Sequence, residues 1–181
     1  MRDALRIRVE REIASRGMKV ADHELLSRQC ERVSTWLTNP SAKQSLLIIG
    51  FVGSGKTTFL SAIHSLLSRF NVPSLYYVAT DLQLPLIETP ETFRGSILHG
   101  DWATYLLMDD IGEEPTEVRD YGRSWPLFTK IVAERYTRML PFIITSNLNL
   151  EQIEDRYGQR TADRLREIAD VIVFNNNSYR K

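Results

Sequence analysis

The chain has 181 residues, of which 43% are hydrophobic and 25% charged, and its formal net charge is zero. This length is that of one domain with a substantial core. The balanced charge excludes an overall attraction to nucleic acid or membrane, so any such contact must come from a local patch. Cys30 is the only cysteine, which excludes an internal disulfide. We expect a cytoplasmic protein, because no apolar run could span a bilayer and the N-terminus lacks a signal-peptide core.

Two helices are predicted at the start of the chain. Apolar residues spaced three or four apart indicate a helix over residues 1–16 and a second over residues 22–37, with Asp22 as its N-cap. Two interpretations are open: a separate partner-binding module, or helices packed on the edge of the following domain. We favour packing, because this segment is too short for a core of its own. The expected division is an N-terminal helical segment, 1–40, and a main domain, 41–181.

Residues 50–57 fit the phosphate-binding loop pattern G-x-x-x-x-G-K-[ST] at every fixed position. An apolar strand-like run at 45–49 precedes the loop, and helical spacing follows at 58–70. In this order, loop N–H groups and the positive end of the helix dipole converge on an anion. The sequence therefore predicts a nucleoside triphosphate site, in which Lys56 reaches the β- and γ-phosphates and the Thr57 hydroxyl holds Mg²⁺. The predicted phosphate-binding residues are Gly50, Phe51, Val52, Gly53, Ser54, Gly55, Lys56, Thr57 and Thr58.

The rest of the chain alternates between strands and helices. Further strands are predicted at 74–79, 103–108, 142–146 and 171–174, and further helices at 125–140, 151–157 and 160–169. Residues 81–100 are interpreted as an irregular connection with short helical pieces, and 113–122 as a charged loop. Five buried strands that alternate with helices predict a parallel sheet with right-handed crossovers.

Polar residues follow two of these strands where a parallel sheet places its ligands. Asp109 and Asp110 end an apolar strand, so we expect Asp109 to hold the Mg²⁺ shell and Asp110 to orient and deprotonate the attacking water. Asn147 follows the next strand and could bond the γ-phosphate or that water. The alternatives are two surface aspartates in a turn before Gly112, and a helix cap or turn role for Asn147.

Five short motifs together carry a family resemblance. They are G-F-V-G-S-G-K-T-T at 50–58, L-L-M-D-D-I-G at 106–112, I-I-T-S-N-L at 143–148, D-R-L-R at 163–166 and S-Y-R at 178–180. With them, residues 44–181 resemble the DnaC/IstB-like AAA+ ATPases, which include replicative helicase loaders and transposition helper ATPases. The phosphate loop alone is unspecific among P-loop proteins, whereas D-D-I-G and T-S-N-L with a later D-R-L are much more specific.

The resemblance implies an α/β three-layer sandwich of the AAA+ P-loop type, with strand order 5-1-4-3-2 and no C-terminal lid domain. It implies that Asn147 is the sensor-1 residue. It also implies that Arg164 is an arginine finger, which acts on the ATP of a neighbouring subunit, with Arg160 as its alternative or helper. The competing interpretation is an exposed arginine-rich helix, in which Asp163 and Glu167 are the ion-pair partners.

The resemblance further implies function. The expected protein is an ATP- and Mg²⁺-dependent switch that assembles into a homo-oligomer on ATP. Its implied partners are DNA and a replicative helicase or transposase, with no membrane. Asp110 stands where many AAA+ proteins have glutamate, so we expect slow hydrolysis. The alternatives are a small-molecule P-loop kinase and a nucleotide-gated binding module with little turnover.

Overall fold

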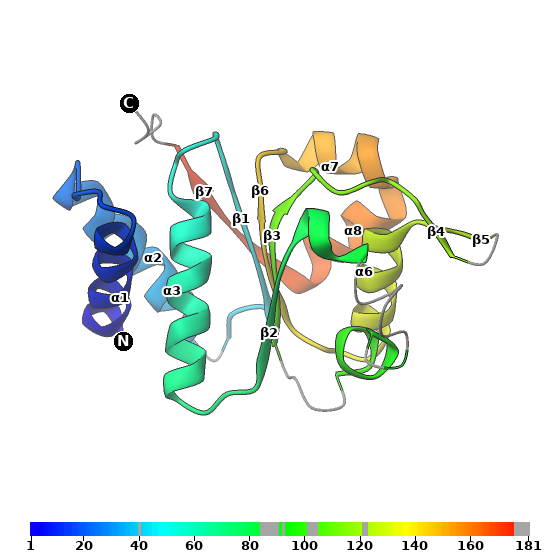
Figure 1. Cartoon of the computed structure of the whole chain (residues 1–181), viewed down its shortest axis with the longest axis horizontal. Helices are drawn as coiled ribbons and strands as arrows, with labels where there is room; N and C mark the ends of the chain where they lie inside the picture. The colour runs from blue at the N-terminus through cyan, green and yellow to red at the C-terminus, as the bar shows by residue number, and fades with distance from the viewer. Residues whose placement is uncertain (40, 84–90, 92, 101–104, 121–122, 176–181) are drawn as a thin grey trace.

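The chain folds as three layers, with helices on both faces of a central sheet (Figure 1). The computed structural model describes residues 1–39, 41–83, 91, 93–100, 105–120 and 123–175. The S-Y-R motif and the junction at residue 40 therefore lie outside the described residues.

The central sheet has five parallel strands. They are β1 (Ser45–Gly50), β2 (Ser74–Val78), β3 (Tyr105–Ile111), β6 (Phe142–Ser146) and β7 (Ala169–Phe174). Their order across the sheet is β2-β3-β6-β1-β7. Numbered along the chain these strands run 2-3-4-1-5, so the predicted order is confirmed. Because all five are parallel, their carboxyl ends lie at one edge of the sheet, at the top of Figure 1.

Six α-helices are described. They are α1 (Arg2–Ser15), α2 (His23–Thr38), α3 (Lys56–Arg69), α6 (Leu127–Thr137), α7 (Leu150–Tyr157) and α8 (Gln159–Ile168). The first three lie on one side of the sheet and the last three on the other (Figure 1). Asp22 is the N-cap of α2, as predicted, and its side chain accepts a bond from the N–H of Leu25. Within the described ranges, no helix is both long enough and apolar enough to cross a membrane.

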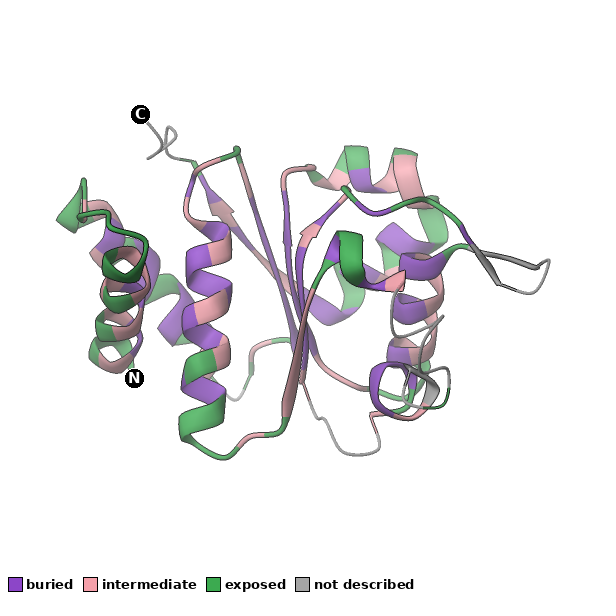
Figure 2. Ribbon diagram, in the orientation of Figure 1, coloured by how far each residue is buried: buried purple, intermediate pink, exposed green. Residues whose placement is uncertain are grey.

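The core is divided by the sheet into two clusters. Along β1, Leu46 and Ile48 face one cluster, and Leu47 and Ile49 face the other, as the alternation of a strand requires. The buried positions run through the sheet and along the inner faces of the helices (Figure 2). Residues of the two N-terminal helices, among them Leu5 and Cys30, are fully buried in the same cluster as Phe59 of α3. The helices α1 and α2 therefore share a core with α3 and the sheet.

Several segments differ from the sequence-based expectation. The helix α3 begins at Lys56 rather than residue 58, because Gly55 adopts a left-handed conformation and serves as the N-cap. Strand β3 continues to Ile111. Two short strands, β4 (Val118–Asp120) and β5 (Arg123–Trp125), form an antiparallel pair. Strand β4 lies within the expected charged loop, and β5 ends at Trp125, where a helix over 125–140 was expected to begin; that helix is the shorter α6. Each of these two strands is three residues long and mostly polar, too short for an alternating pattern to be recognised.

The connection after β2 is described only in part. It contains η1 (Ala79–Asp81), a 3₁₀ turn, and η2 (Phe93–Leu98), a π-helical turn. The rest of the expected irregular connection lies outside the described residues.

Candidate functional site

The phosphate-binding loop joins β1 to α3 at the carboxyl edge of the sheet. A Cβ at Gly50 would lie 2.5 Å from the carbonyl oxygen of Phe174, so only glycine fits where β1 passes the end of β7. Gly55 has φ +97° and allows the chain to turn directly into α3. The first N–H groups of α3 therefore face the loop, where a phosphate would need donors.

Lys56 lies inside this loop and is only 4% exposed. Its Nζ donates to the carbonyl oxygens of Gly50 and Phe51, at 2.8 and 2.9 Å. It also donates to Oδ1 of Asn147, at 2.7 Å. The ends of β1 and β6 thus bring the loop lysine and the candidate sensor asparagine into direct contact.

Asp109 lies at the centre of a hydrogen-bonded group and is 2% exposed. Its Oδ1 accepts from the hydroxyls of Thr57, at 3.2 Å, and Thr145, and its Oδ2 accepts from the hydroxyl of Tyr76, at 2.9 Å. Burial and the charge of Asp109 raise the pKa of Tyr76, so its hydroxyl remains a donor. The roles of Tyr76 and Thr145 were not predicted, because nothing local in the sequence marks them.

The pair Thr57 and Asp109 fits a Mg²⁺ site. Hydroxyl and carboxylate oxygens are the donors that this ion prefers, and it is usually held by one or two carboxylates together with substrate phosphates. The described residues contain no cluster of three or more His, Cys, Asp or Glu side chains able to hold a metal.

Asp110 is placed by a β-bulge. Met108 pairs with Ile144 and Ile111 pairs with Ser146, so Asp109 and Asp110 together stand opposite the single residue Thr145. Asp110 has φ +55°, and its N–H donates to Oγ1 of Thr145 at 2.9 Å. Consecutive residues of a regular strand point to opposite faces. The bulge instead allows Asp109 to bind Thr57 while Asp110 lines the same pocket as Lys56.

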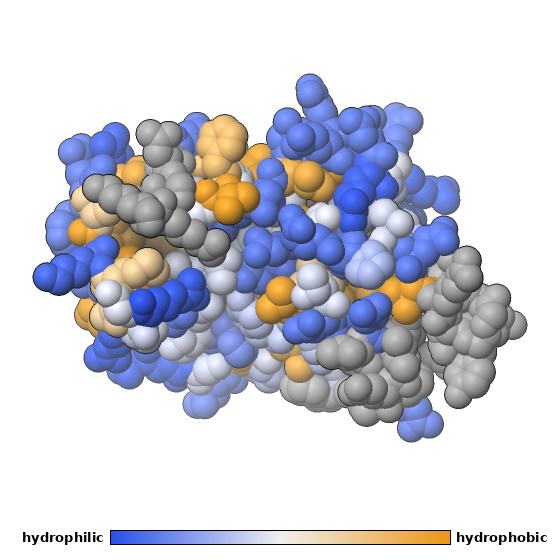
Figure 3. All heavy atoms as spheres, turned by 45° about the horizontal axis from the view of Figure 1, so that its top comes forward, coloured by the Kyte–Doolittle hydropathy of each residue, from blue (hydrophilic) through white to orange (hydrophobic). Residues whose placement is uncertain are grey.

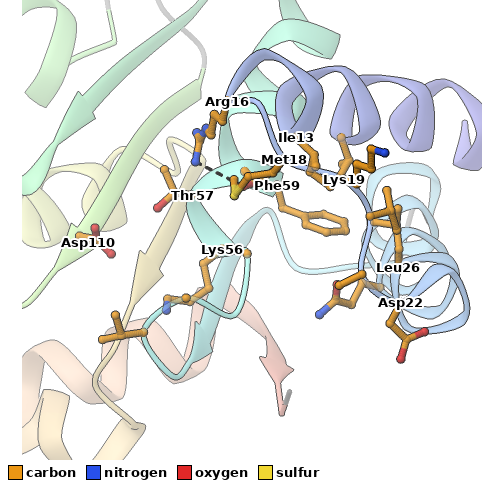
Figure 4. Close-up of a pocket in the computed structure, with 18 of the residues that line it drawn as sticks. Ile13, Arg16, Met18, Lys19, Asp22, Leu26, Lys56, Thr57, Phe59 and Asp110 are labelled. Carbon is orange, nitrogen blue, oxygen red and sulfur yellow. Dashed lines mark hydrogen bonds between the residues drawn. The ribbon is translucent and has the colours of Figure 1, made fainter. Parts of the chain in front are cut away.

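A cavity of about 420 Å³ opens beside the loop. Figure 4 shows Lys56, Thr57 and Asp110 on one side of it, and residues of α1, α2 and the segment between them on the other. The second side is the more apolar one, although Arg16, Lys19, Asp22 and Gln29 also belong to it. Its apolar residues are Val9, Ile13, Met18, Val20, Ala21 and Leu26, and Phe59 of α3 also lines the cavity. The pocket is in the size range of small-molecule sites and joins a polar half to an apolar half.

Arg160 and Arg164 are not among the described residues that line this pocket. Both lie on α8, on the far side of the sheet from α3 (Figure 1). Arg160 is exposed, and the guanidinium of Arg164 lies over the ring of Tyr136, 5.3 Å from its centroid. Neither forms an ion pair with a described residue, whereas Asp163 pairs with Arg166 and Glu167 accepts from Tyr136.

Known proteins match this chain in structure. No family model and no curated protein matches its sequence. Solved structures do match: the DnaC helicase loader has 20% identity and a TM-score of 0.65 over 84% of this chain and 91% of that one. DnaI has 23% identity and a TM-score of 0.62, over 85% of this chain and 87% of that one.

The replication initiator DnaA bound to AMPPCP and single-stranded DNA also matches, with 19% identity and a TM-score of 0.58. That match covers 83% of this chain and 46% of that one. The chain therefore has a P-loop fold of the AAA+ type. Its fold is that of the DnaC helicase loader and of DnaI, which confirms the resemblance to DnaC-like AAA+ proteins at the level of fold.

Proposed function

We propose that this protein binds ATP with Mg²⁺ and hydrolyses it slowly, as a switch in DNA replication or transposition. One observation carries the proposal. Lys56, Thr57, Asp109, Asp110 and Asn147 come from three separate strand ends and meet around one pocket. An AAA+ fold supports a nucleotide role, and a structural neighbour of similar fold holds AMPPCP.

In this proposal the cavity is divided between the two ends of ATP. The triphosphate lies along the loop, where backbone N–H groups and Lys56 meet its charge. The base lies in the apolar half, between Phe59 and the residues of α1 and α2. The two N-terminal helices then form one wall of the nucleotide site.

Hydrolysis is assigned to side chains at the ends of β3 and β6. Mg²⁺, held by Thr57 and Asp109, would neutralise charge on the phosphates. Asp110 accepts the proton of the attacking water and aligns that water. The Oδ1 atom of Asn147 accepts from Lys56, and its Nδ2 group supplies donors toward the γ-phosphate or the water.

Assembly is assigned to the opposite side of the sheet. Arg164, with Arg160 as its helper, would reach the ATP of a neighbouring copy, where a permanently charged planar fork stabilises the developing phosphate charge. The loop tip would face that neighbour, because Phe51 and Val52 are 71% and 61% exposed. Figure 3 turns the strand-end edge forward and shows a mainly hydrophilic surface with small hydrophobic patches. Supplied by a second copy, Arg164 would make hydrolysis depend on assembly.

The partners of the switch are proposed from the structural neighbours. One is a helicase loader and another is bound to single-stranded DNA. We therefore propose DNA, with a replicative helicase or a transposase, as what the assembled form holds. With zero net charge, DNA contact would run through local basic residues and weaken as salt rises.

The test of the nucleotide proposal is phosphate release from ATP with Mg²⁺ and no acceptor present. The wild-type protein should release phosphate, and Lys56→Ala should neither bind ATP nor release phosphate. Release only with an added acceptor would indicate a small-molecule kinase. Tight ATP binding without phosphate release, even after assembly on DNA, would indicate a binding module.

A further inference from the structure

Arg16, at the end of α1, also lines the pocket beside the phosphate-binding loop. Arg16 is the C-cap of that helix, forty residues before the phosphate-binding loop's Lys56 in sequence. Its side chain nevertheless reaches the start of α3, where it lies beside Thr57 (Figure 4). The Nη1 atom lies 3.5 Å from Oγ1 of Thr58, at the outer limit of a hydrogen bond.

A second contact holds the guanidinium in this place. Nη2 of Arg16 pairs with Oε1 of Glu12, one turn earlier on α1, at 2.8 Å. Both side chains are about one third exposed, so the pair is open to water on one side. The long contact to Thr58 and the open side leave the fork of the guanidinium placed for a stronger acceptor.

The guanidinium of Arg16 adds positive charge to the pocket that Lys56 also lines. It lies beside Thr57, the residue after Lys56 in the phosphate-binding loop (Figure 4). A phosphate chain bound along the loop would therefore lie within electrostatic reach of this guanidinium.

We propose that Arg16 binds the phosphate chain of the nucleotide within the same subunit. The proposal rests on the proposed function, because it concerns the same pocket. It makes α1 a part of the phosphate site as well as of the wall around the base. Arginine suits this role because its planar fork can donate two parallel bonds to phosphate oxygens.

The experiment measures ATP and ADP affinity by calorimetry for wild type, Arg16→Gln, Arg16→Lys and two controls. Arg16→Gln should weaken the binding of both nucleotides about tenfold. This is the effect expected from the loss of one charged hydrogen bond, reduced because the side chain is partly exposed. Arg16→Lys should lose less affinity than Arg16→Gln, because lysine keeps the positive charge although it lacks the planar fork. Arg11→Gln, an exposed arginine of the same helix outside the pocket, should bind as wild type does.

Glu12→Gln separates binding from a merely structural role. If Arg16 only holds α1 in place through its pair with Glu12, Arg16→Gln and Glu12→Gln should weaken ATP binding equally. If Arg16 binds phosphate, Glu12→Gln should bind ATP at least as tightly as wild type, because it removes a competing negative charge. The urea midpoint of each nucleotide-free variant should stay near wild type, and weaker ATP binding that only follows a lowered midpoint would overturn the proposal.

Wild type and Lys56→Ala distinguish a failure at Arg16 from a failure of the whole nucleotide site. If wild type binds ATP, Lys56→Ala does not, and Arg16→Gln binds as wild type, then Arg16 has no phosphate role and only this inference is overturned. If wild type does not bind ATP at all, the proposed function itself fails, and this inference with it.

Discussion

The Nζ atom of Lys56 lies 2.7 Å from Oδ1 of Asn147, which joins the phosphate-binding loop to the end of β6. Asn147→Ala removes this acceptor and the amide donors next to it. We expect single-turnover hydrolysis to fall about 10²-fold, as when an oriented donor to a developing charge is lost. ATP affinity should change by less than about threefold, because Lys56 keeps its contacts with Gly50 and Phe51. An unchanged rate with strongly weakened binding would show that Asn147 only positions the lysine.

Asp110→Asn should separate binding from hydrolysis. The amide keeps the shape of the side chain but cannot accept a proton from water, so hydrolysis should drop by about 10²-fold or more. ATP binding should persist, which equilibrium titration would measure alongside the single-turnover rate. Asp155→Asn, an exposed aspartate on α7, is the matched control. Full activity in Asp110→Asn would remove Asp110 from the mechanism.

Glu114 connects the turn after β3 to the end of α7. It is 2% exposed; its Oε2 accepts from the N–H of Gly112 at 2.8 Å, and its Oε1 accepts from the hydroxyl of Tyr157. Burial and this bond to Glu114 raise the pKa of Tyr157. Glu114→Ala leaves two partly buried donors without their acceptor, so it should cost about 1 kcal/mol of unfolding free energy. Because Gly112 closely follows Asp110, hydrolysis should slow as well.

Urea unfolding and single-turnover hydrolysis would measure these two effects, with Glu113→Ala, its exposed neighbour, as the control. Tyr157→Phe should reproduce part of the loss of stability. If Glu114→Ala is as stable and active as Glu113→Ala, the contact contributes nothing.

Labelling of the Cys30 thiol would measure the opening of α2, which forms part of the pocket wall. Cys30 is fully buried in α2, and burial raises the pKa of its thiol from 9.0 to about 11. At pH 8 the folded state therefore holds only about 10⁻³ of the thiol as reactive thiolate. Labelling should follow opening of the helix, and ATP at a hundred times its Kd should slow labelling by up to about 100-fold.

Because Cys30 is the only cysteine, the labelling signal has one source. Lys56→Ala should show no protection by ATP. Protection that is absent in wild type despite measured ATP binding would mean that α2 opens independently of the nucleotide site. The same thiol makes the free energy of unfolding depend on pH. Its contribution is fully present below pH 9, where the thiol is protonated in both the folded and the unfolded state. The contribution is lost as pH rises from 9 toward about 11, because the unfolded thiol ionises first.

Much of the site could be predicted because its parts are local. The loop is a fixed pattern between a strand and a helix, and Asp109, Asp110 and Asn147 each follow an apolar run. In a parallel sheet these ends must share an edge. The fold followed from the same strands, and the order β2-β3-β6-β1-β7 was implied by the family resemblance.

The remainder depends on contacts between distant segments. The bulge at Asp109 and Asp110 is set by pairing with β6, which no local pattern encodes. Tyr76 enters the site only because β2 lies next to β3, and Arg16 only because α1 packs on α3. In the sequence Arg16 is one more charged residue at the end of a predicted helix, so its place at the pocket could not be inferred without the fold.

The most direct test of an ATP-closed interface is the size of the protein in solution with and without ATP. Wild type should shift to a larger species on ATP with Mg²⁺, while Arg164→Ala should bind ATP and stay small. Arg166→Ala, on the same helix but paired with Glu154 and Asp163, should assemble as wild type does. Arg164→Ala that assembles and hydrolyses ATP like wild type would contradict the account.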